Sequence, residues 1–253
     1  MRYIKGEIII SEEHDLPLLK HVMASRYITQ SQLWRFLATD GNEFSRRSYV
    51  WRVKRLADHG FLGRLAHSAV NGDCTYTITG KSVTYLQSAG QLYTGPENGP
   101  GTEPDLNHVA HSIGLNAIHL RFLDTKALLS WESETEIRSR NELTDNGYRK
   151  DYDAVVTLLL GGEPKRFALE YERSPKTFKE YAAIRKRIES ERLVHQFLYL
   201  VPNRHLQSFL KQCYQKINRP LYIGSSVDLE RVTPDVLQVL DVRSNQNRLL
   251  KEV

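Results

Sequence analysis

A segment rich in glycine and proline divides this sequence, and it limits most strongly what the chain can fold into. Residues 91–105, QLYTGPENGPGTEPD, contain three Gly and three Pro and show no apolar periodicity, which is the composition of a linker. A chain of 253 residues is long enough for two small domains, each with its own core. We therefore expect one domain at 1–90, a linker at 91–105 and a second domain at 106–253.

The basic charge of the chain is concentrated in the first of these domains. Residues 1–90 contain 12 Lys and Arg against 8 Asp and Glu, a formal charge of +4, whereas residues 91–253 contain 23 against 22, a charge of +1. Within residues 44–64 there are six basic side chains and one acid, and such patches neutralise nucleic-acid phosphates. The charge distribution therefore indicates that the first domain binds DNA.

The order of elements in the first domain is typical of one DNA-binding fold. Apolar spacing predicts helices over 15–25, 29–37 and 45–59, with Thr29 and Ser45 as N-caps and Gly60 just past the third helix. Two β-rich runs, 61–69 and 74–79, flank the hairpin signal Asn71-Gly72. Three helices and a hairpin predict a winged helix-turn-helix, and HGFLGRLAHSAVNGDCTYTITGKSVTYL resembles the wing segment of winged-helix DNA-binding proteins.

This resemblance implies that the third helix enters the major groove of DNA. We expect its buried face to be apolar, formed by Val50, Val53, Leu56 and Ala57. The candidates for phosphate or base contacts are basic or aromatic residues of this helix and of the first wing strand: Arg46, Arg47, Tyr49, Arg52, Lys54, Arg55 and Arg64. The alternative is a solvated basic face without a ligand.

The second domain alternates between helical and strand patterns. The sequence predicts a helix over 106–122, strands over 128–138, 151–160 and 166–172, a charged helix over 176–192, a strand over 195–201, a helix over 204–217 and a strand over 221–224. Such an order predicts a mixed sheet flanked by helices. The whole chain is therefore expected to combine an α+β domain and an α/β domain.

Three acids occupy corresponding ends of two predicted strands in this domain. Asp153 lies at the start of one strand, and Glu170 and Glu172 lie on one face at the end of the next. Carboxylates at neighbouring strand ends can hold Mg²⁺ or Mn²⁺, which prefer oxygen ligands. Such an ion supports phosphodiester hydrolysis because it polarises the phosphate and activates water.

This pattern of acids resembles the PD-(D/E)XK nuclease superfamily. The segments HSIGLNAIHLRF, YRKDYDAVV and FALEYERSPKTFKEY are most similar to the replication-relaxation group of mobile-element proteins, which join a winged helix to a nuclease-like domain. The resemblance implies a PD-(D/E)XK nuclease-like fold with Asp153, Glu170 and Glu172 as site residues.

Two positions depart from the superfamily pattern. Glu172 stands where Lys is usual, and Tyr152 stands where the signature has Pro. Lys176 or Lys179 on the following helix is therefore a candidate for the missing cation. Further candidate metal ligands are Glu134 and Glu136, expected on the first strand, and His111, expected on the first helix of the domain.

The leading hypothesis is a DNA-binding protein of a plasmid, phage or mobile element that nicks or cleaves DNA during replication or mobilisation, with Mg²⁺ or Mn²⁺ as cofactor. One alternative is a non-catalytic winged-helix regulator or replication accessory factor with a degenerate nuclease fold. Another is an adaptor whose charged helix binds a replication protein. The expected partners are double-stranded DNA, a second copy of the chain at a palindromic site, and replication or mobilisation proteins.

Cysteine content and hydropathy indicate the compartment. Cys74 and Cys213 lie far apart in the sequence and cannot form a disulfide framework or, alone, a zinc site. The first residues contain a short apolar run followed at once by acids, and no window is long and apolar enough to span a membrane. We therefore expect a reduced, cytoplasmic protein without a membrane partner.

Overall fold

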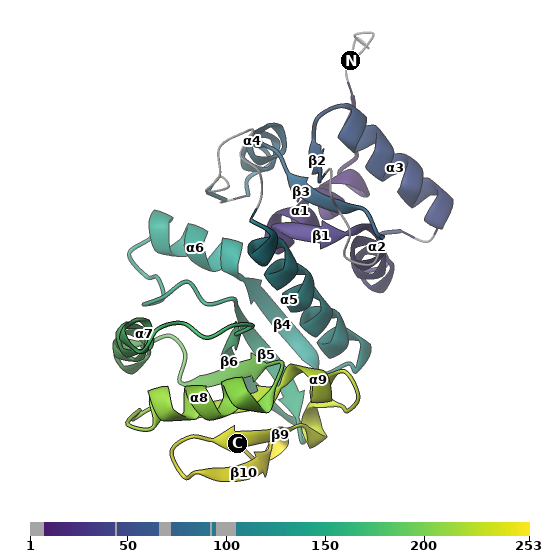
Figure 1. Ribbon diagram of the computed structural model, residues 1–253. Helices are drawn as coiled ribbons and strands as arrows, with labels where there is room; N and C mark the ends of the chain where they lie inside the picture. Colours follow the sequence, from purple (N-terminus) through teal and green to yellow (C-terminus); the bar gives the residue numbers. More distant parts are fainter. Residues whose placement is uncertain (1–7, 44, 66–71, 92, 95–104) are drawn as a thin grey trace. The chain divides into compact units, whose positions relative to one another are not determined.

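A computed structural model describes residues 8–43, 45–65, 72–91, 93–94 and 105–253, in two compact units (Figure 1). The units comprise residues 1–116 and 117–253, so the division falls inside helix α5 (Leu106–Asp124), whereas the sequence predicts a boundary at 91–105. Asn71 of the expected hairpin turn and most of the expected linker lie outside the described residues.

The N-terminal unit consists of a small antiparallel sheet and short helices. Its elements are α1 (Asp15–Ser25), β1 (Tyr27–Thr29), α2 (Gln30–Thr39), α3 (Arg46–Asp58), β2 (Leu62–Arg64), β3 (Thr75–Ile78) and α4 (Gly80–Ser88). Strand β3 lies between β1 and β2 and is antiparallel to both. The first part of α5 belongs to this unit: Asn116 Nδ2 donates to the Tyr27 carbonyl at 2.9 Å, and Gln32 Nε2 donates to the Ile113 carbonyl at 2.8 Å.

The helix ends of this unit follow the signals in the sequence. The Thr29 side chain accepts a hydrogen bond from the Gln32 amide, and the Gln32 side chain closes a capping box on the Thr29 amide. Ser45 caps α3 by accepting from the Ser48 amide. Gly60 has a φ of +72°, a conformation that glycine adopts easily just beyond a helix. Both predicted N-caps and the predicted helix-ending glycine are therefore confirmed.

A buried group of charges joins α3 to α1. The Asp15 side chain has no exposed surface and accepts hydrogen bonds from the Arg55 guanidinium and, at 3.3 Å, from Arg52 Nη1. Arg52 also lies 3.3 Å from the Glu43 carboxylate, which is itself buried. Removing one partner of a buried ion pair costs about 3–5 kcal/mol, because the other charge is left uncompensated. Arg52 and Arg55 therefore stabilise the position of α3.

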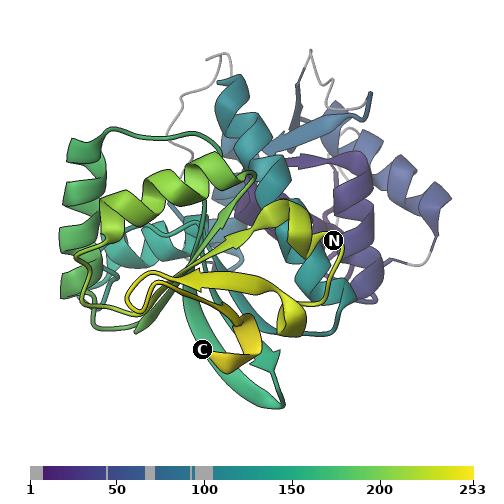
Figure 2. The same ribbon diagram turned by 60° about the horizontal axis from the view of Figure 1, so that its bottom comes forward.

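The C-terminal unit is a mixed α/β fold built on a seven-stranded sheet. Its elements beyond α5 are β4 (Leu128–Ser133), α6 (Glu134–Leu143), β5 (Ala154–Leu160), β6 (Glu163–Tyr171), α7 (Phe178–Ser190), β7 (Gln196–Val201), α8 (Arg204–Tyr214), β8 (Leu221–Ser225), α9 (Ser226–Leu229), β9 (Gln238–Asp241) and β10 (Gln246–Leu249). The strand order is β10-β9-β8-β7-β6-β5-β4. The β6–β7 and β7–β8 pairs are parallel and the others antiparallel. Helices flank this sheet (Figure 2).

The main core of this unit lies between the sheet and helices α7 and α8. Tyr181 of α7, Tyr214 of α8 and Phe197 of β7 are fully buried in it, and Ala168 of β6 faces the same core. Because side chains on a strand alternate between faces, Glu170 points to the same face as Ala168. The fold therefore places this acid at the margin of an apolar core.

Two sequence predictions about local structure are wrong. The predicted strand over 128–138 ends at Ser133, where a capping box between Ser133 and Glu136 begins α6 and satisfies two backbone amides. Glu134 and Glu136 therefore lie in the first turn of a helix. Val50, predicted on the buried face of the third helix, is 43% exposed, and Tyr49 takes its place in the core.

Candidate active site

Two carboxylates stand opposite each other where β5 begins and β6 ends. The antiparallel register pairs Ala154 with Leu169, so the preceding residue, Asp153, comes opposite Glu170. Asp153 Oδ2 accepts a hydrogen bond from the Tyr171 amide at 2.6 Å. The Glu170 side chain is only 8% exposed, and its backbone pairs with that of Tyr199 on β7. The sequence prediction that these strands bring two acids together agrees with this register.

Each glutamate at the end of β6 has its own lysine. Lys150 Nζ lies 2.5 Å from Glu170 Oε1, and Lys176 Nζ donates to Glu172 Oε1 at 2.6 Å. Lys176, a sequence candidate, is 41% exposed at its side chain, whereas Lys150 is 14% exposed. Sequence reasoning missed Lys150, although the run Tyr-Arg-Lys-Asp-Tyr-Asp places this cation three residues before Asp153. The cluster therefore balances two buried carboxylates with two ammonium groups.

Burial controls the protonation of the inner pair. Removal from water raises the pKa of Glu170, Lys150 opposes this, and the nearby Asp153 charge adds to it, so that together they bring the pKa to about 7. Burial alone would lower the pKa of Lys150, but the Glu170 and Asp153 carboxylates hold that pKa above its usual value. Lys150 is therefore charged at neutral pH, while Glu170 is near the midpoint of its titration.

The other proposed ligands are distributed unevenly around this cluster. The Glu134 amide donates to the Asp153 carbonyl at 3.1 Å, and the Glu134 charge contributes to the raised pKa of Lys150, so Glu134 lies beside the cluster. The Glu136 carboxylate is committed to its capping box with Ser133. Lys179 is an exposed residue of α7, and His111 belongs to the N-terminal unit.

The donor chemistry of this cluster can be tested against a divalent ion. Among the residues that the structure describes, no group of three or more His, Cys, Asp and Glu side chains is arranged to hold a metal ion. Asp153 and Glu170 nevertheless supply carboxylate oxygens from opposite register positions, the donor type that Mg²⁺ prefers. By donor type the pair fits such an ion, with Lys150 as the competing cation.

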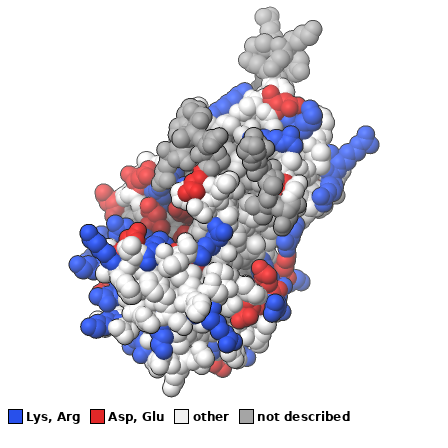
Figure 3. Space-filling model, viewed as in Figure 1, with Lys and Arg blue, Asp and Glu red and all other residues white. Residues whose placement is uncertain are grey.

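The candidate DNA contacts on α3 separate into an exposed set and an internal set. Arg46, Arg47 and Lys54 are exposed, and Lys and Arg side chains project over α3 in Figure 3. Tyr49 is buried and donates its hydroxyl hydrogen to the Gln30 carbonyl at 2.6 Å. Arg52 and Arg55 hold Asp15, as described above. Arg64, on β2, is exposed and donates to Cys74 Sγ at 2.9 Å.

Two apolar residues of α3 that were not among the candidates join the exposed set. Trp51 is 60% exposed and Val50 is 43% exposed. Together with Arg47 and Lys54 they follow the spacing i, i+3, i+4, i+7, which places all four on one helix face. The Arg55 guanidinium lies 5.1 Å from the centre of the Trp51 ring and supports its orientation. The exposed face of α3 is therefore both basic and apolar.

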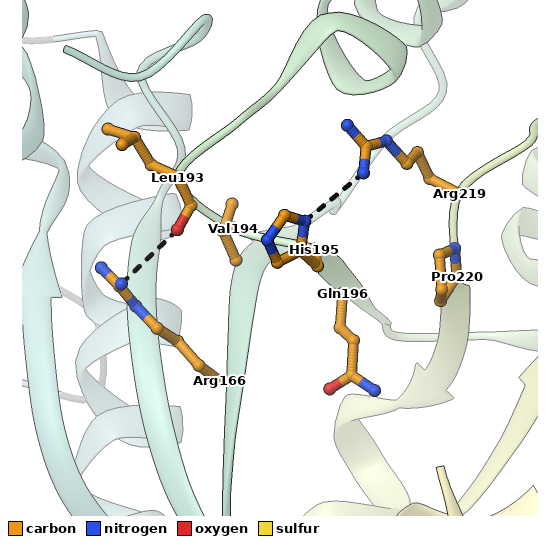
Figure 4. Close-up of a pocket in the computed structure, with 7 residues that line it drawn as sticks. All are labelled: Arg166, Leu193, Val194, His195, Gln196, Arg219 and Pro220. Atoms are coloured by element: carbon orange, nitrogen blue, oxygen red, sulfur yellow. Dashed lines mark hydrogen bonds between the residues drawn. The ribbon is translucent and has the colours of Figure 1, made fainter. Parts of the chain in front are cut away.

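A separate cavity of about 510 Å³ lies at the opposite end of β7 from the acids (Figure 4). Arg219 Nη1 donates to His195 Nδ1 at 3.4 Å, and Arg166 Nη1 donates to the Leu193 carbonyl at 3.5 Å. Arg219 also donates to the carbonyls of Glu189 and Glu191, the latter at the C-cap of α7. Both arginines thus have structural hydrogen bonds to the backbone.

Comparisons with known proteins add little to this geometry. No family model matches the sequence, so its resemblance to the replication-relaxation group stays a prediction, and no curated protein sequence matches it. A structure of the restriction endonuclease FokI bound to DNA aligns with a TM-score of 0.27 and 10% identity. The alignment covers 85% of this chain and 42% of that one. A similarity of this size carries no argument about fold or function.

In the part of the chain that the structure describes, no helix has the length and apolar character needed to cross a membrane. Cys74 and Cys213 are both free thiols.

Proposed function

We propose that this protein binds DNA through its N-terminal unit and hydrolyses a phosphodiester bond through its C-terminal unit, with Mg²⁺ or Mn²⁺ as cofactor. The observation that carries the proposal is the cross-strand pair Asp153 and Glu170, of which Glu170 is buried and paired with Lys150. Carboxylates and a lysine at the ends of adjacent strands suit phosphoryl chemistry, in which charge on the phosphate must be stabilised. The resemblance described above implies a role as a nickase in replication or mobilisation of a plasmid, phage or other mobile element.

Each member of the cluster has a specific part in this proposal. Asp153 and Glu170 would hold the ion, which supplies a polarised phosphate and a water of lowered pKa. Lys150 favours the ionised form of Glu170, since its charge opposes the effect of burial on the Glu170 pKa. Glu172 accepts a hydrogen bond from the attacking water and thereby orients it. Lys176 neutralises Glu172 and would face the phosphate.

The N-terminal unit is proposed to be a winged helix that presents α3 to the major groove. Arg46, Arg47 and Lys54 would contact phosphates, which usually receive most of the hydrogen bonds in such interfaces. Val50 and Trp51 would contact apolar base edges, of which the thymine methyl group is the main one in the major groove. Tyr49, Arg52 and Arg55 are left out of this interface because their side chains make internal contacts.

Replacing Arg47 by alanine is expected to weaken duplex binding and to reduce its salt dependence. Loss of one phosphate contact lowers the slope of log K against log salt concentration by about one. The measurement is a salt titration of duplex binding by fluorescence anisotropy, with Lys186→Ala on α7, also exposed, as the matched control. A slope that Arg47→Ala leaves unchanged, or that Lys186→Ala lowers equally, would contradict the placement of α3 on DNA.

The nuclease proposal predicts that the purified protein converts supercoiled plasmid to the nicked form when Mg²⁺ or Mn²⁺ is present. A chelator is expected to stop the reaction, because the carboxylate pair alone lacks the Lewis acid that the reaction needs. The measurement is gel separation of plasmid forms over time, with and without chelator. Nicking that continues in excess chelator would contradict the role of the metal.

The second candidate function is a non-catalytic DNA-binding factor. The observation that favours it is that Lys150 and Lys176 already neutralise Glu170 and Glu172, as in a structural ion-pair cluster. Calorimetry with Mn²⁺ in the presence of DNA separates the two functions. Absence of both metal binding and nicking would favour the non-catalytic factor, whose C-terminal unit would then serve for self-association or recruitment of replication proteins.

A further inference from the structure

An open groove adjoins the carboxylate cluster, and no role has yet been assigned to it. It has a volume of about 750 Å³ and lies where α7 and α8 begin. Its lining includes Arg173, Lys176, His205 and Phe209. Lys176 connects the groove to the cluster directly, since its ammonium group holds Glu172, two residues beyond Glu170. The groove therefore shares Lys176 with the candidate active site.

Basic and other polar side chains line the groove. Its lining contains the cations Arg173 and Lys176, of which Lys176 is paired with Glu172, and the acid Glu180. The Glu180 carboxylate is committed to a capping box, accepting from the Thr177 amide and hydroxyl at 2.7 Å. The exposed imidazole of His205 adds a further hydrogen-bonding group. In the first turn of each of α7 and α8, one amide donates to the side chain of its own cap residue, so the proposed attraction comes from the side chains.

An exposed aromatic ring packs against the lining of the groove. Phe178, the first residue of α7, is 60% exposed. Its ring lies 5.0 Å from that of Phe209, which lines the groove, and Phe209 in turn lies 5.8 Å from the buried ring of Tyr181. Phe178 thus packs, through tilted and edge-on ring contacts, against aromatic side chains that continue into the core. Leaving such a large apolar ring in water has a cost that a stacking partner would remove.

We propose that this groove binds a single strand of DNA, with phosphates at Arg173 and Lys176 and a base stacked on Phe178. Basic side chains that follow a backbone, combined with aromatic rings that stack on bases, are how proteins hold single strands without reading their sequence. In a paired duplex the bases are stacked on each other, so Phe178 selects an unpaired strand. This inference rests on the proposed function, which it deepens by naming an unpaired strand as the substrate at the carboxylate cluster.

The test measures binding of the full chain to a labelled single-stranded oligonucleotide and to its duplex, in chelator and without metal. Phe178→Ala is expected to weaken single-strand binding by about ten-fold and to leave duplex binding unchanged. Phe178→Trp is expected to retain the affinity of the wild-type protein for the single strand. The matched control is Leu143→Ala on α6, which removes a side chain that is 53% exposed.

The proposal would be overturned if Phe178→Ala bound the single strand with wild-type affinity, or if it lost affinity equally for the single strand and the duplex. It would also be overturned if Phe178→Trp lost as much single-strand affinity as Phe178→Ala. Because the assay contains no metal, its result does not depend on catalysis. Absence of plasmid nicking with Mg²⁺ would refute the proposed nuclease activity while a selective effect of Phe178→Ala still supported the groove. Plasmid nicking with Mg²⁺, combined with no selective effect of Phe178→Ala, would refute the proposed role of the groove and leave the nuclease activity supported.

Discussion

Asp153→Asn and Glu170→Gln are each expected to lower the rate of plasmid nicking by about a thousand-fold. Both changes keep the size of the side chain and remove the charge that would hold the ion. A metal ion contributes several kcal/mol to such reactions, and each 1.4 kcal/mol corresponds to a factor of ten in rate. Because the proposal assigns duplex binding to α3 of the other unit, the duplex affinity of both variants should match that of the wild-type protein.

The measurement combines nicking rates with calorimetric titration of Mn²⁺ into each protein. Asp145→Asn is the matched control, because Asp145 is exposed in the loop after α6 and its change removes the same charge. Both cluster variants are expected to lose metal binding and nicking together. The control is expected to keep both properties. Either cluster variant nicking at the wild-type rate would remove that residue from the proposed site.

The elements with strong local signals could be predicted from the sequence. Helices α1 and α5 each carry apolar residues at helical spacing, and the structure gives them close to the predicted bounds. The tight turn at Gly161-Gly162 joins β5 and β6 and fixes their antiparallel register. This register places Asp153 opposite Glu170, so the pairing of the two acids could be predicted.

The missed features depend on signals that hydrophobic periodicity does not contain. The alternating pattern that Ile137 continues favours a strand where the structure has helix α6. The capping box from Ser133 to Glu136 marks the start of that helix. Strands β9 and β10 are short and partly exposed, so their patterns are weak. The inward orientation of Arg52 depends on Asp15, 37 residues earlier. A sequence pattern cannot show such tertiary partners of a charged residue.

Lys150→Met is expected to move the pH dependence of nicking to higher pH. Sequence reasoning left Lys150 out of the candidate site. In the wild-type protein, nicking should rise as pH increases through about 7, since Glu170 must lose its proton to hold a metal ion and its pKa is about 7. Lys150 lowers that pKa. Lys150→Met therefore raises the Glu170 pKa, and the rate at pH 7 should fall by about ten-fold or more, with recovery at higher pH.

The raised pKa of Glu170 also makes the free energy of unfolding depend on pH, and this dependence can be measured without DNA. A carboxyl group whose folded-state pKa lies above its unfolded value contributes stability at low pH, and this contribution is lost as pH rises through the folded-state pKa. For Glu170 that loss occurs between about 4.5 and 7. Lys150→Met should extend the loss to higher pH, so the free energy of unfolding of the variant should fall further below the wild-type value when pH rises from 6 to 8.

Lys176→Met is the matched control for this effect. Lys176 pairs with Glu172 and has a smaller influence on the Glu170 pKa than Lys150 has, so its profile should move less. Urea denaturation across pH measures the stability, and a carbon-13 titration of the Glu170 carboxyl measures its pKa directly. If Lys150→Met left both the titration and the pH–rate profile unchanged, Lys150 would not control the charge of Glu170. A pKa that rose as expected, without any nicking activity, would establish the coupling as a property of the fold and favour the non-catalytic function.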